Sequence, residues 1–141
     1  MTEVPIPKEV LAEILEKIKG YFKSYNKSIS GSGYYLKPIH FSSRQVEGKK
    51  RKYVYLGRYW WKVLYLGRTK EGKVKLKWIY VGKTKPSGLP EPPDNPLEGV
   101  SIYIKEGEDD FYFIYPKGEK IELIEKIEKI LGKKDQRVTL L

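Results

Sequence analysis

The sequence predicts an α+β fold: a twisted antiparallel sheet of hairpins, flanked by an N-terminal and a C-terminal helix. Apolar residues recur at three- and four-residue steps over 10–22 and again over 121–131, which is the spacing of an amphipathic helix. Between these stretches lie segments rich in Val, Ile, Tyr and Trp, separated by turns that contain Gly. Such segments are typical of strands joined as hairpins.

A short phrase of the form apolar–Tyr–apolar–Gly–basic occurs three times, ending at Arg58, Arg68 and Lys83. A second phrase, Glu-Gly-Lys, occurs at 47–49 and 71–73. Glycine in a turn adopts positive φ without steric cost, so a strand, Glu-Gly-Lys and a second strand indicate a hairpin. We therefore expect two copies of one hairpin, each with a Lys-rich return strand that ends in the repeated phrase.

The first helix is expected to begin near Pro7 and to run for roughly four turns. Its apolar stripe should pack on the sheet, with pairing to a second copy in a homodimer as the alternative. The Ser- and Gly-rich segment 28–33 is expected to be a flexible connector. The strands that follow are expected over 34–41, 51–56, 59–66 and 74–81.

Five of the nine prolines lie in 86–99, which predicts an extended, stiff surface loop and a boundary between segments 1–85 and 100–141. After it we expect a hairpin around the acidic turn 106–110, a helix that stops at Gly132, and a loose tail over 133–141. A hairpin and one helix are too small to be stable alone, so this part should pack with the first part as one domain.

Positive charge is concentrated in one region of the chain. Residues 34–86 contain 15 Lys/Arg and two acids, a net charge of +13, whereas the rest contains 13 Lys/Arg and 16 acids, a net charge of −3. This asymmetry exceeds what solubility requires and favours a polyanionic partner.

Lysines two apart on a strand lie about 6.6–7 Å apart on one face and can meet successive phosphates. The expected basic contacts are Arg44, Lys49, Lys50, Arg51, Lys52, Arg58, Lys62, Arg68, Lys70, Lys73, Lys75, Lys77 and Lys83. Aromatic residues among them can stack on bases, and the expected ones are Tyr53, Tyr55, Trp60 and Trp61. The alternatives are core packing for at least half of these aromatics and a solvated sheet face for the lysines.

The segment from Arg68 to Lys83, with its Glu-Gly-Lys turn, basic strand and Tyr-apolar-Gly ending, resembles a hairpin of some insertion-sequence transposases and small archaeal mobile-element proteins. Residues 47–58 are similar to it. The resemblance implies association with nucleic acid. The acidic catalytic triad of such transposases has no counterpart in this sequence, so it does not imply strand transfer.

Residues suited to catalysis or to cofactor binding are scarce. Cysteine is absent, His40 is the one histidine, and no Gly-rich phosphate loop occurs. The turn at Glu108, Asp109 and Asp110 offers carboxylates for a cation, but the favoured explanation is that these acids fill a solvated hairpin turn. We therefore expect no enzyme activity, no catalytic or metal-binding residues and no cofactor.

The expected function is non-catalytic nucleic-acid binding, with duplex DNA as the ligand of a basic, aromatic-rich sheet. The alternatives are binding to RNA or the ribosome, and a protein-interaction or regulatory module of a mobile element. No apolar run spans a membrane and no secretory leader is visible, so we expect a cytoplasmic protein without membrane contact. The bias towards Lys, Glu and Ile is typical of hyperthermophiles and suggests an archaeal source.

Overall fold

The structure is a computed structural model that describes residues 2–116 and 118–139. The chain forms β1 (Thr2–Ile6), α1 (Lys8–Ser28), a 3₁₀ turn (Ser30–Ser32), β2 (Tyr34–Val46), β3 (Lys49–Arg68), β4 (Val74–Gly82), β5 (Ser101–Lys105), β6 (Phe111–Tyr115), α2 (Lys120–Leu131) and α3 (Gln136–Thr139). The strands make one antiparallel sheet in the order β1-β6-β5-β3-β2, and β4 pairs with the far half of β3. The predicted α+β class is therefore confirmed.

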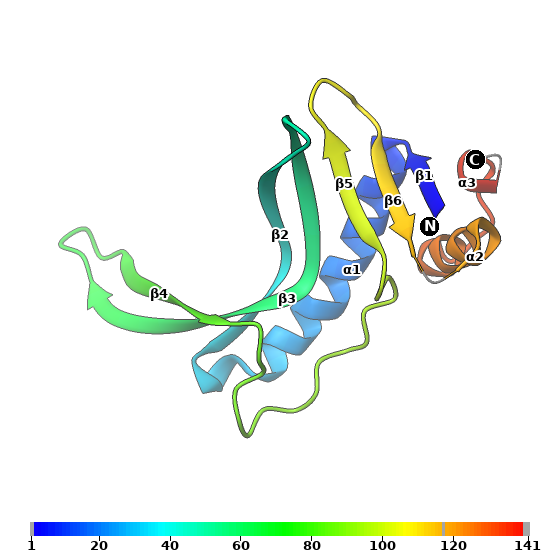
Figure 1. Ribbon diagram of the computed structural model, residues 1–141. Helices are drawn as coiled ribbons and strands as arrows, with labels where there is room; N and C mark the ends of the chain where they lie inside the picture. The colour runs from blue at the N-terminus through cyan, green and yellow to red at the C-terminus, as the bar shows by residue number, and fades with distance from the viewer. Residues whose placement is uncertain (1, 117, 140–141) are drawn as a thin grey trace.

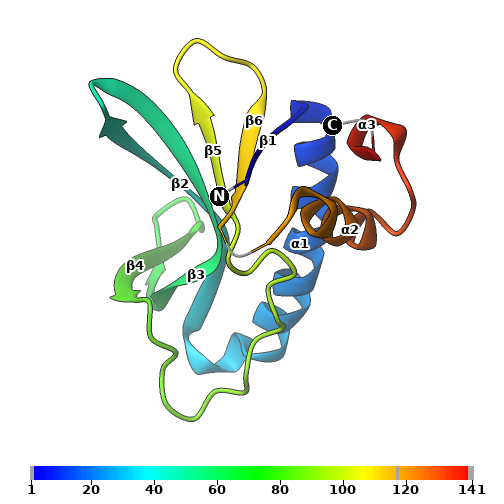
Figure 2. The same ribbon diagram turned by 45° about the vertical axis from the view of Figure 1, so that its right-hand side comes forward.

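The helices lie on one side of the sheet, and the opposite side, named here the outer face, is open in the described part of the chain (Figures 1 and 2). The apolar stripe of α1 is buried on the sheet, as predicted, so that a homodimer would need another surface. Each such buried side chain contributes about 1.5–3 kcal/mol. The large side chains buried in this core include Val4, Ile6, Ile14, Ile18, Phe22, Leu36, Leu97, Ile102, Phe113, Leu123 and Ile127.

The N-terminal segment differs from the prediction in two respects. Thr2–Ile6 forms an edge strand, β1, in which Val4 and Ile6 alternate into the core. Pro5 is tolerated there because an edge strand leaves one side without a partner. The helix is also longer than the predicted four turns, since α1 has 21 residues and Pro7 is its N-cap.

The segment 28–33 was wrongly expected to be flexible. Ser28 ends α1, and its hydroxyl donates to the carbonyl of Tyr25 at 2.6 Å. Ser32 makes the same kind of bond to the carbonyl of Ile29 at 2.7 Å, and the Ile29 side chain is buried. The same two carbonyls also accept from the backbone N–H groups of Ile29 and Ser32, so this connector is an ordered turn.

The expected strands 51–56 and 59–66 are one continuous strand, β3, because the first copy of the repeated phrase forms a β-bulge at Gly57 instead of a strand end. Gly57 and the next residue stand opposite the single residue Pro38, and Leu66 with Gly67 stand opposite Lys75. The third glycine of the phrase, Gly82, adjoins another shift in register. The three glycines have φ values of 55°, 98° and 137°. Bulges bend and twist a strand, so the phrase marks where the hairpins bend.

The sequence suggested that the two Glu-Gly-Lys hairpins are equivalent copies, but in the structure they differ. The first has a two-residue turn in which Glu47 and Gly48 both have positive φ, and its return strand pairs with β5 inside the sheet. The second has a longer turn over 69–73. Beyond Val63, whose N–H donates to the carbonyl of Gly33 at 2.7 Å, its two strands pair only with each other among the described residues. This second hairpin, residues 61–82, projects from the body and is named the arm (Figure 1).

The Pro-rich segment forms an extended surface loop, as predicted. Leu97 anchors it in the core, and the hydroxyl of Tyr25 donates to the carbonyl of Pro90 at 2.6 Å. The hairpin that follows, β5–β6, enters the same sheet between β1 and β3. Strands from both sides of the loop therefore share one sheet and one cluster of buried residues.

The tail after Gly132 was predicted to be loose, but its described part is attached to the body. Val138 is buried, and Asp135 is 7% exposed. Arg137 donates to Asp135 and, at 2.7 Å, to Glu13 on α1. Leu140 and Leu141, at the end of that tail, lie outside the described residues.

The Asp135–Arg137 pair should make this attachment sensitive to acid. The hydrogen bonds from Arg137 lower the pKa of the Asp135 carboxyl to about 2. A carboxyl with a depressed folded-state pKa stabilises the fold above its unfolded pKa, near 3.9, and this contribution is lost as pH falls towards 2. We expect Asp135→Asn to lower the melting temperature at pH 7, and the difference from the wild type to close by about pH 2. A difference that stays constant with pH would show that the charge of Asp135 is not what matters.

Candidate nucleic-acid interface

The structure divides the basic and aromatic residues expected at the interface into four groups. The arm holds Lys62, Arg68, Lys70, Lys73, Lys75, Lys77 and Trp61, with Lys83 just after β4. The outer face holds Arg44, Arg51, Tyr53, Tyr55 and Arg58. The first hairpin tip holds Lys49, Lys50 and Lys52. Trp60 lies in the core.

Trp60 was wrongly expected to be available to a ligand. It is 3% exposed, and its ring meets that of Tyr25 edge to face at 6.1 Å. Trp60 follows the alternation of Val54 and Leu56, which face α1. The neighbouring Trp61 points to the outer face.

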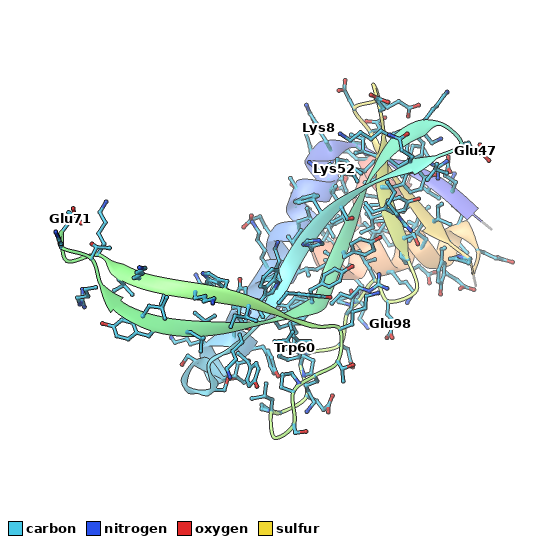
Figure 3. All side chains as sticks on the ribbon, turned by 60° about the vertical axis from the view of Figure 1, so that its left-hand side comes forward. Lys8, Glu47, Lys52, Trp60, Glu71 and Glu98 are labelled. Atoms are coloured by element: carbon cyan, nitrogen blue, oxygen red, sulfur yellow. The ribbon has the colours of Figure 1, made fainter. Side chains whose placement is uncertain are left out.

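The arm exposes both charge and apolar surface. Every residue of 70–81 is exposed, and Figure 3 places Glu71 at the far end of the arm. The arm has six Lys/Arg and one acid, Glu71. Of the eleven exposed large hydrophobic side chains in the described part, eight belong to it: Tyr65, Leu66, Val74, Leu76, Trp78, Ile79, Tyr80 and Val81. An exposed apolar surface of this kind marks an interaction site.

The two faces of the arm differ, as the alternation in the sequence predicted. Leu76, Trp78 and Tyr80 of β4 stand opposite Tyr65, Val63 and Trp61 of β3, which makes one face aromatic and apolar. The other face pairs Lys77 with Leu64 and Ile79 with Lys62. The arm thus presents lysines on one side and rings on the other.

Three tyrosines form a row across the outer face. Tyr53, Tyr103 and Tyr112 stand directly opposite one another on β3, β5 and β6, with ring centroids 5.5 and 5.7 Å apart. Tyr55 extends this tyrosine row along β3, 6.3 Å from Tyr53. Cross-strand aromatic pairs stabilise a sheet. Tyr103 is fully buried among its neighbours, and Tyr53, Tyr55 and Tyr112 are partly exposed on the outer face.

Three cations form a second row beside the tyrosine row. Arg44, Arg51 and Lys105 stand directly opposite one another on β2, β3 and β5. They lie 4.0, 4.6 and 4.2 Å from the ring centroids of Tyr53, Tyr103 and Tyr112 respectively, within cation–π range. Like charges directly opposite destabilise a sheet, so this cation row suits an anionic ligand.

Two carboxylates bond to the tyrosine row, Glu108 to Tyr112 and Glu3 to Tyr103, and Glu3 also contacts the cation row. Glu3 accepts a hydrogen bond from the hydroxyl of Tyr103 and lies 3.3 Å from the Lys105 ammonium. The bond from Tyr103 lowers the pKa of the Glu3 carboxyl, and burial raises the pKa of the Tyr103 phenol far above its ordinary value. Among the described residues neither Arg44 nor Arg51 makes a salt bridge, although the Arg51 guanidinium interacts with the Tyr53 side chain.

Arg58 and His40 continue the outer face towards the arm. Arg58 lies over the rings of Tyr55 and Tyr59 at 4.9 and 5.8 Å. His40 contacts Tyr59 at 4.7 Å between centroids, and its Nδ1 lies 3.1 Å from the Lys37 ammonium. Burial lowers the pKa of His40, and the charge of Lys37 lowers it further. The imidazole is therefore neutral at pH 7, and Nδ1 accepts from Lys37.

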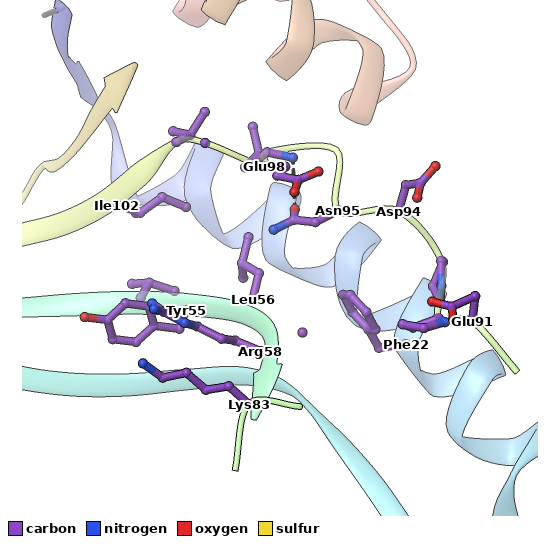
Figure 4. A pocket seen from close by; sticks show the side chains of 17 residues that line it. Phe22, Tyr55, Leu56, Arg58, Lys83, Glu91, Asp94, Asn95, Glu98 and Ile102 are labelled. Carbon is purple, nitrogen blue, oxygen red and sulfur yellow. Dashed lines mark hydrogen bonds between the residues drawn. The ribbon is translucent and has the colours of Figure 1, made fainter. Parts of the chain in front are cut away.

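A cavity of about 550 Å³ lies between β3 and the Pro-rich loop (Figure 4). On this side β3 pairs with β5 only as far as Val54 and with β4 only from Trp60. Arg58 and Lys83 line one wall, and Glu91, Asp94 and Glu98 line the wall formed by the loop. Those carboxylates would repel a phosphate, so this cavity does not belong to the basic surface that would bind an anionic ligand.

Tyr103, Lys105 and Tyr112 were missed in the sequence, although they complete both rows. They lie about 50 residues from β3 in a segment that was read only as an acidic hairpin. The two-residue spacing of Tyr103 and Lys105 indicates that both point to one face of a strand. The sequence did not reveal which strand would lie next to it. Tyr35 and Lys37 on β2 were missed in the same way.

In the described ranges no group of three or more possible metal ligands comes together, and the Glu108 carboxylate accepts from the hydroxyl of Tyr112. No helix in these ranges combines the length and the apolarity needed to cross a membrane. Comparison of the chain with protein-family models, with curated proteins and with solved structures gives no match.

Proposed function

We propose that the protein binds nucleic acid without catalysis, and that duplex DNA is its main ligand. The observation that carries this proposal is the arm, which combines six cations with exposed rings and projects away from the body. The outer face adds the guanidinium groups of Arg44, Arg51 and Arg58. Lys62 and Lys77 of the arm point to the side opposite the outer face, so the arm and the outer face are two neighbouring basic surfaces, each with aromatic residues close by.

The shape of the arm favours DNA over double-stranded RNA. The major groove of B-form DNA admits a two-stranded β-ribbon, and proteins that read DNA with strands use this geometry. The corresponding groove of an RNA helix is deep and narrow, so side chains cannot reach its base edges. Lysines along the ribbon would contact phosphates on both sides of the groove.

The chemistry of two ionisable side chains of the outer face, His40 and Tyr103, supports binding over catalysis. His40 is neutral and engaged with Lys37, and the Tyr103 phenol is buried with a raised pKa. A tyrosine nucleophile needs the opposite, a lowered pKa or an adjacent base. The outer face is therefore better suited to holding phosphates than to attacking them.

The test is the affinity of the wild-type protein for duplex DNA as a function of salt. Each neutralised phosphate contributes about −0.9 to the slope of log K against log salt concentration. We expect binding below about 1 μM at low salt and a slope of about −5 or steeper, which is what six or more contacts give. Micromolar or weaker binding at low salt, or a flat salt dependence, would exclude the proposal. Competition with single strands and structured RNA then ranks the ligands.

A protein partner is the second candidate, because the same arm exposes eight large hydrophobic side chains. The six cations of the arm disfavour a basic partner and a second copy of the arm, but not an acidic protein. Capture of partners from a host extract, with and without nuclease, separates the two functions. Partners that survive nuclease treatment would support this second candidate.

A further inference from the structure

A shallow aromatic pocket of about 290 Å³ lies where the arm leaves the body. Tyr35, Lys37, Trp61 and Trp78 line it, and they come from three neighbouring strands. Tyr35 stands opposite Trp61 across β2 and β3, and its ring meets that of Trp78 edge to face at 5.4 Å. The pocket is thus bounded by the rings of aromatic side chains, and its volume is at the small end of ligand sites.

The indole of Trp61 has an unmet hydrogen-bonding requirement. Its Nε1 is buried, and it has no acceptor among the described residues. Buried donors in native proteins nearly always have a partner, so an orphan of this kind needs an explanation. Because this atom has almost no solvent-accessible surface, a ligand in the open pocket does not reach it, and the class of ligand follows from the aromatic walls and the charge around them.

The charge around the pocket restricts the class of ligand. Lys37 forms part of the wall and no carboxylate lines it, so a cation such as an ammonium group would be repelled. Tyr80, which contacts Trp61 at 5.3 Å, also contacts Tyr59, over which Arg58 lies. The approach to the pocket is therefore basic, which suits an uncharged ring attached to an anionic backbone.

We propose that this pocket receives one unpaired base of a nucleic-acid strand. The inference rests on the proposed function and adds a preference for DNA with an unstacked nucleotide over fully paired DNA. Within a duplex the faces of a base are covered by its neighbours, and only its edges are accessible. An unpaired base can stack on the rings of Tyr35, Trp61 and Trp78, while its flanking phosphates meet Lys37 and Arg58.

The preference can be measured with three DNA duplexes of equal sequence. The first is fully paired, the second carries one bulged thymidine, and the third carries an abasic nucleotide at the bulge. The last two have the same number of phosphates and the same interruption, so only the base distinguishes them. Stacking on aromatic side chains predicts about tenfold or tighter binding to the bulged thymidine than to the abasic bulge.

Two substitutions should abolish this difference, and a third should not. Trp78→Leu and Tyr35→Leu each remove a wall of the pocket, and neither side chain belongs to the buried core. Tyr65→Leu removes a ring that is 63% exposed on the same face of the arm but outside the pocket. We expect the Tyr65 variant to keep the preference for the bulged base, with circular dichroism showing that all three variants are folded.

The possible results separate the inference from the proposed function. Equal affinity for the bulged thymidine and the abasic bulge, with firm binding of the paired duplex, would overturn the inference and leave the proposed function intact. Failure to bind the paired duplex would overturn the proposed function. An equal loss of preference in the Tyr65 variant and the Trp78 variant would also count against the pocket, because the effect would then belong to the whole arm.

Discussion

Replacement of Gly57 by Ala is expected to destabilise the protein by about 3 kcal/mol or more, the range of severe core overpacking and backbone strain. Gly57 has a φ of 55°, where a side chain is strained. A Cβ at this position would lie 2.2 Å from Cζ of Phe22, whose ring is held in the core between α1 and the sheet. Neither the bulge nor the ring can move without loss of packing.

Two other glycines are matched controls for this substitution. Gly67 occupies the equivalent place in the repeated phrase with a φ of 98°, but a Cβ added there would meet nothing within 4 Å. Gly67→Ala should therefore cost only the backbone strain, about 1–3 kcal/mol. Gly20 is exposed within α1 and has open space, so Gly20→Ala should stabilise by about 0.5–1 kcal/mol. Urea unfolding measures all three, and a Gly57 variant no less stable than the Gly67 variant would disprove the clash with Phe22.

Replacement of Lys73, Lys75 and Lys77 by Gln should weaken binding to duplex DNA by about tenfold or more and flatten the salt dependence. If each lysine meets one phosphate, the slope of log K against log salt should change by about 2.7. All three side chains are exposed on the arm. The fold should be unaffected, because exposed surface substitutions usually change stability by less than about 0.5 kcal/mol.

The matched control removes three lysines from the helical side of the molecule. Lys120, Lys126 and Lys129 all lie on α2, away from the outer face and the arm. Their replacement by Gln removes the same net charge, yet it should leave the affinity and the salt slope nearly unchanged. An equal loss in both variants would mean that only net charge matters. Full binding by the folded arm variant would favour a protein partner.

The sequence by itself determined the elements with strong local periodicity. The sequence predicted the apolar stripes of α1 and α2, the two Glu-Gly-Lys hairpins and the β5–β6 hairpin. Helices and strands repeat every 3.6 and 2 residues, so their patterns can be recognised from residues close together in the chain. The concentration of charge over 34–86 and the opposite orientation of Lys77 and Trp78 on β4 also follow from the sequence alone. The repeated Tyr-apolar-Gly phrase was visible, but its role as a bulge was not, since a glycine with positive φ suits a strand end equally well.

The tertiary structure alone decided which residues come together at the candidate interface. Trp60 and Trp61 are adjacent and alike, and α1 covers the face that Trp60 occupies, which buries one ring in the core and leaves the other to line a pocket. Likewise, Tyr53 meets Tyr103 only because β5 pairs with β3 across about 50 residues of chain. Alternation shows that a strand has two faces, but which face is buried depends on long-range packing of helices and strands. That packing depends on how residues far apart in the chain are buried together in the core, and a local sequence pattern does not show this.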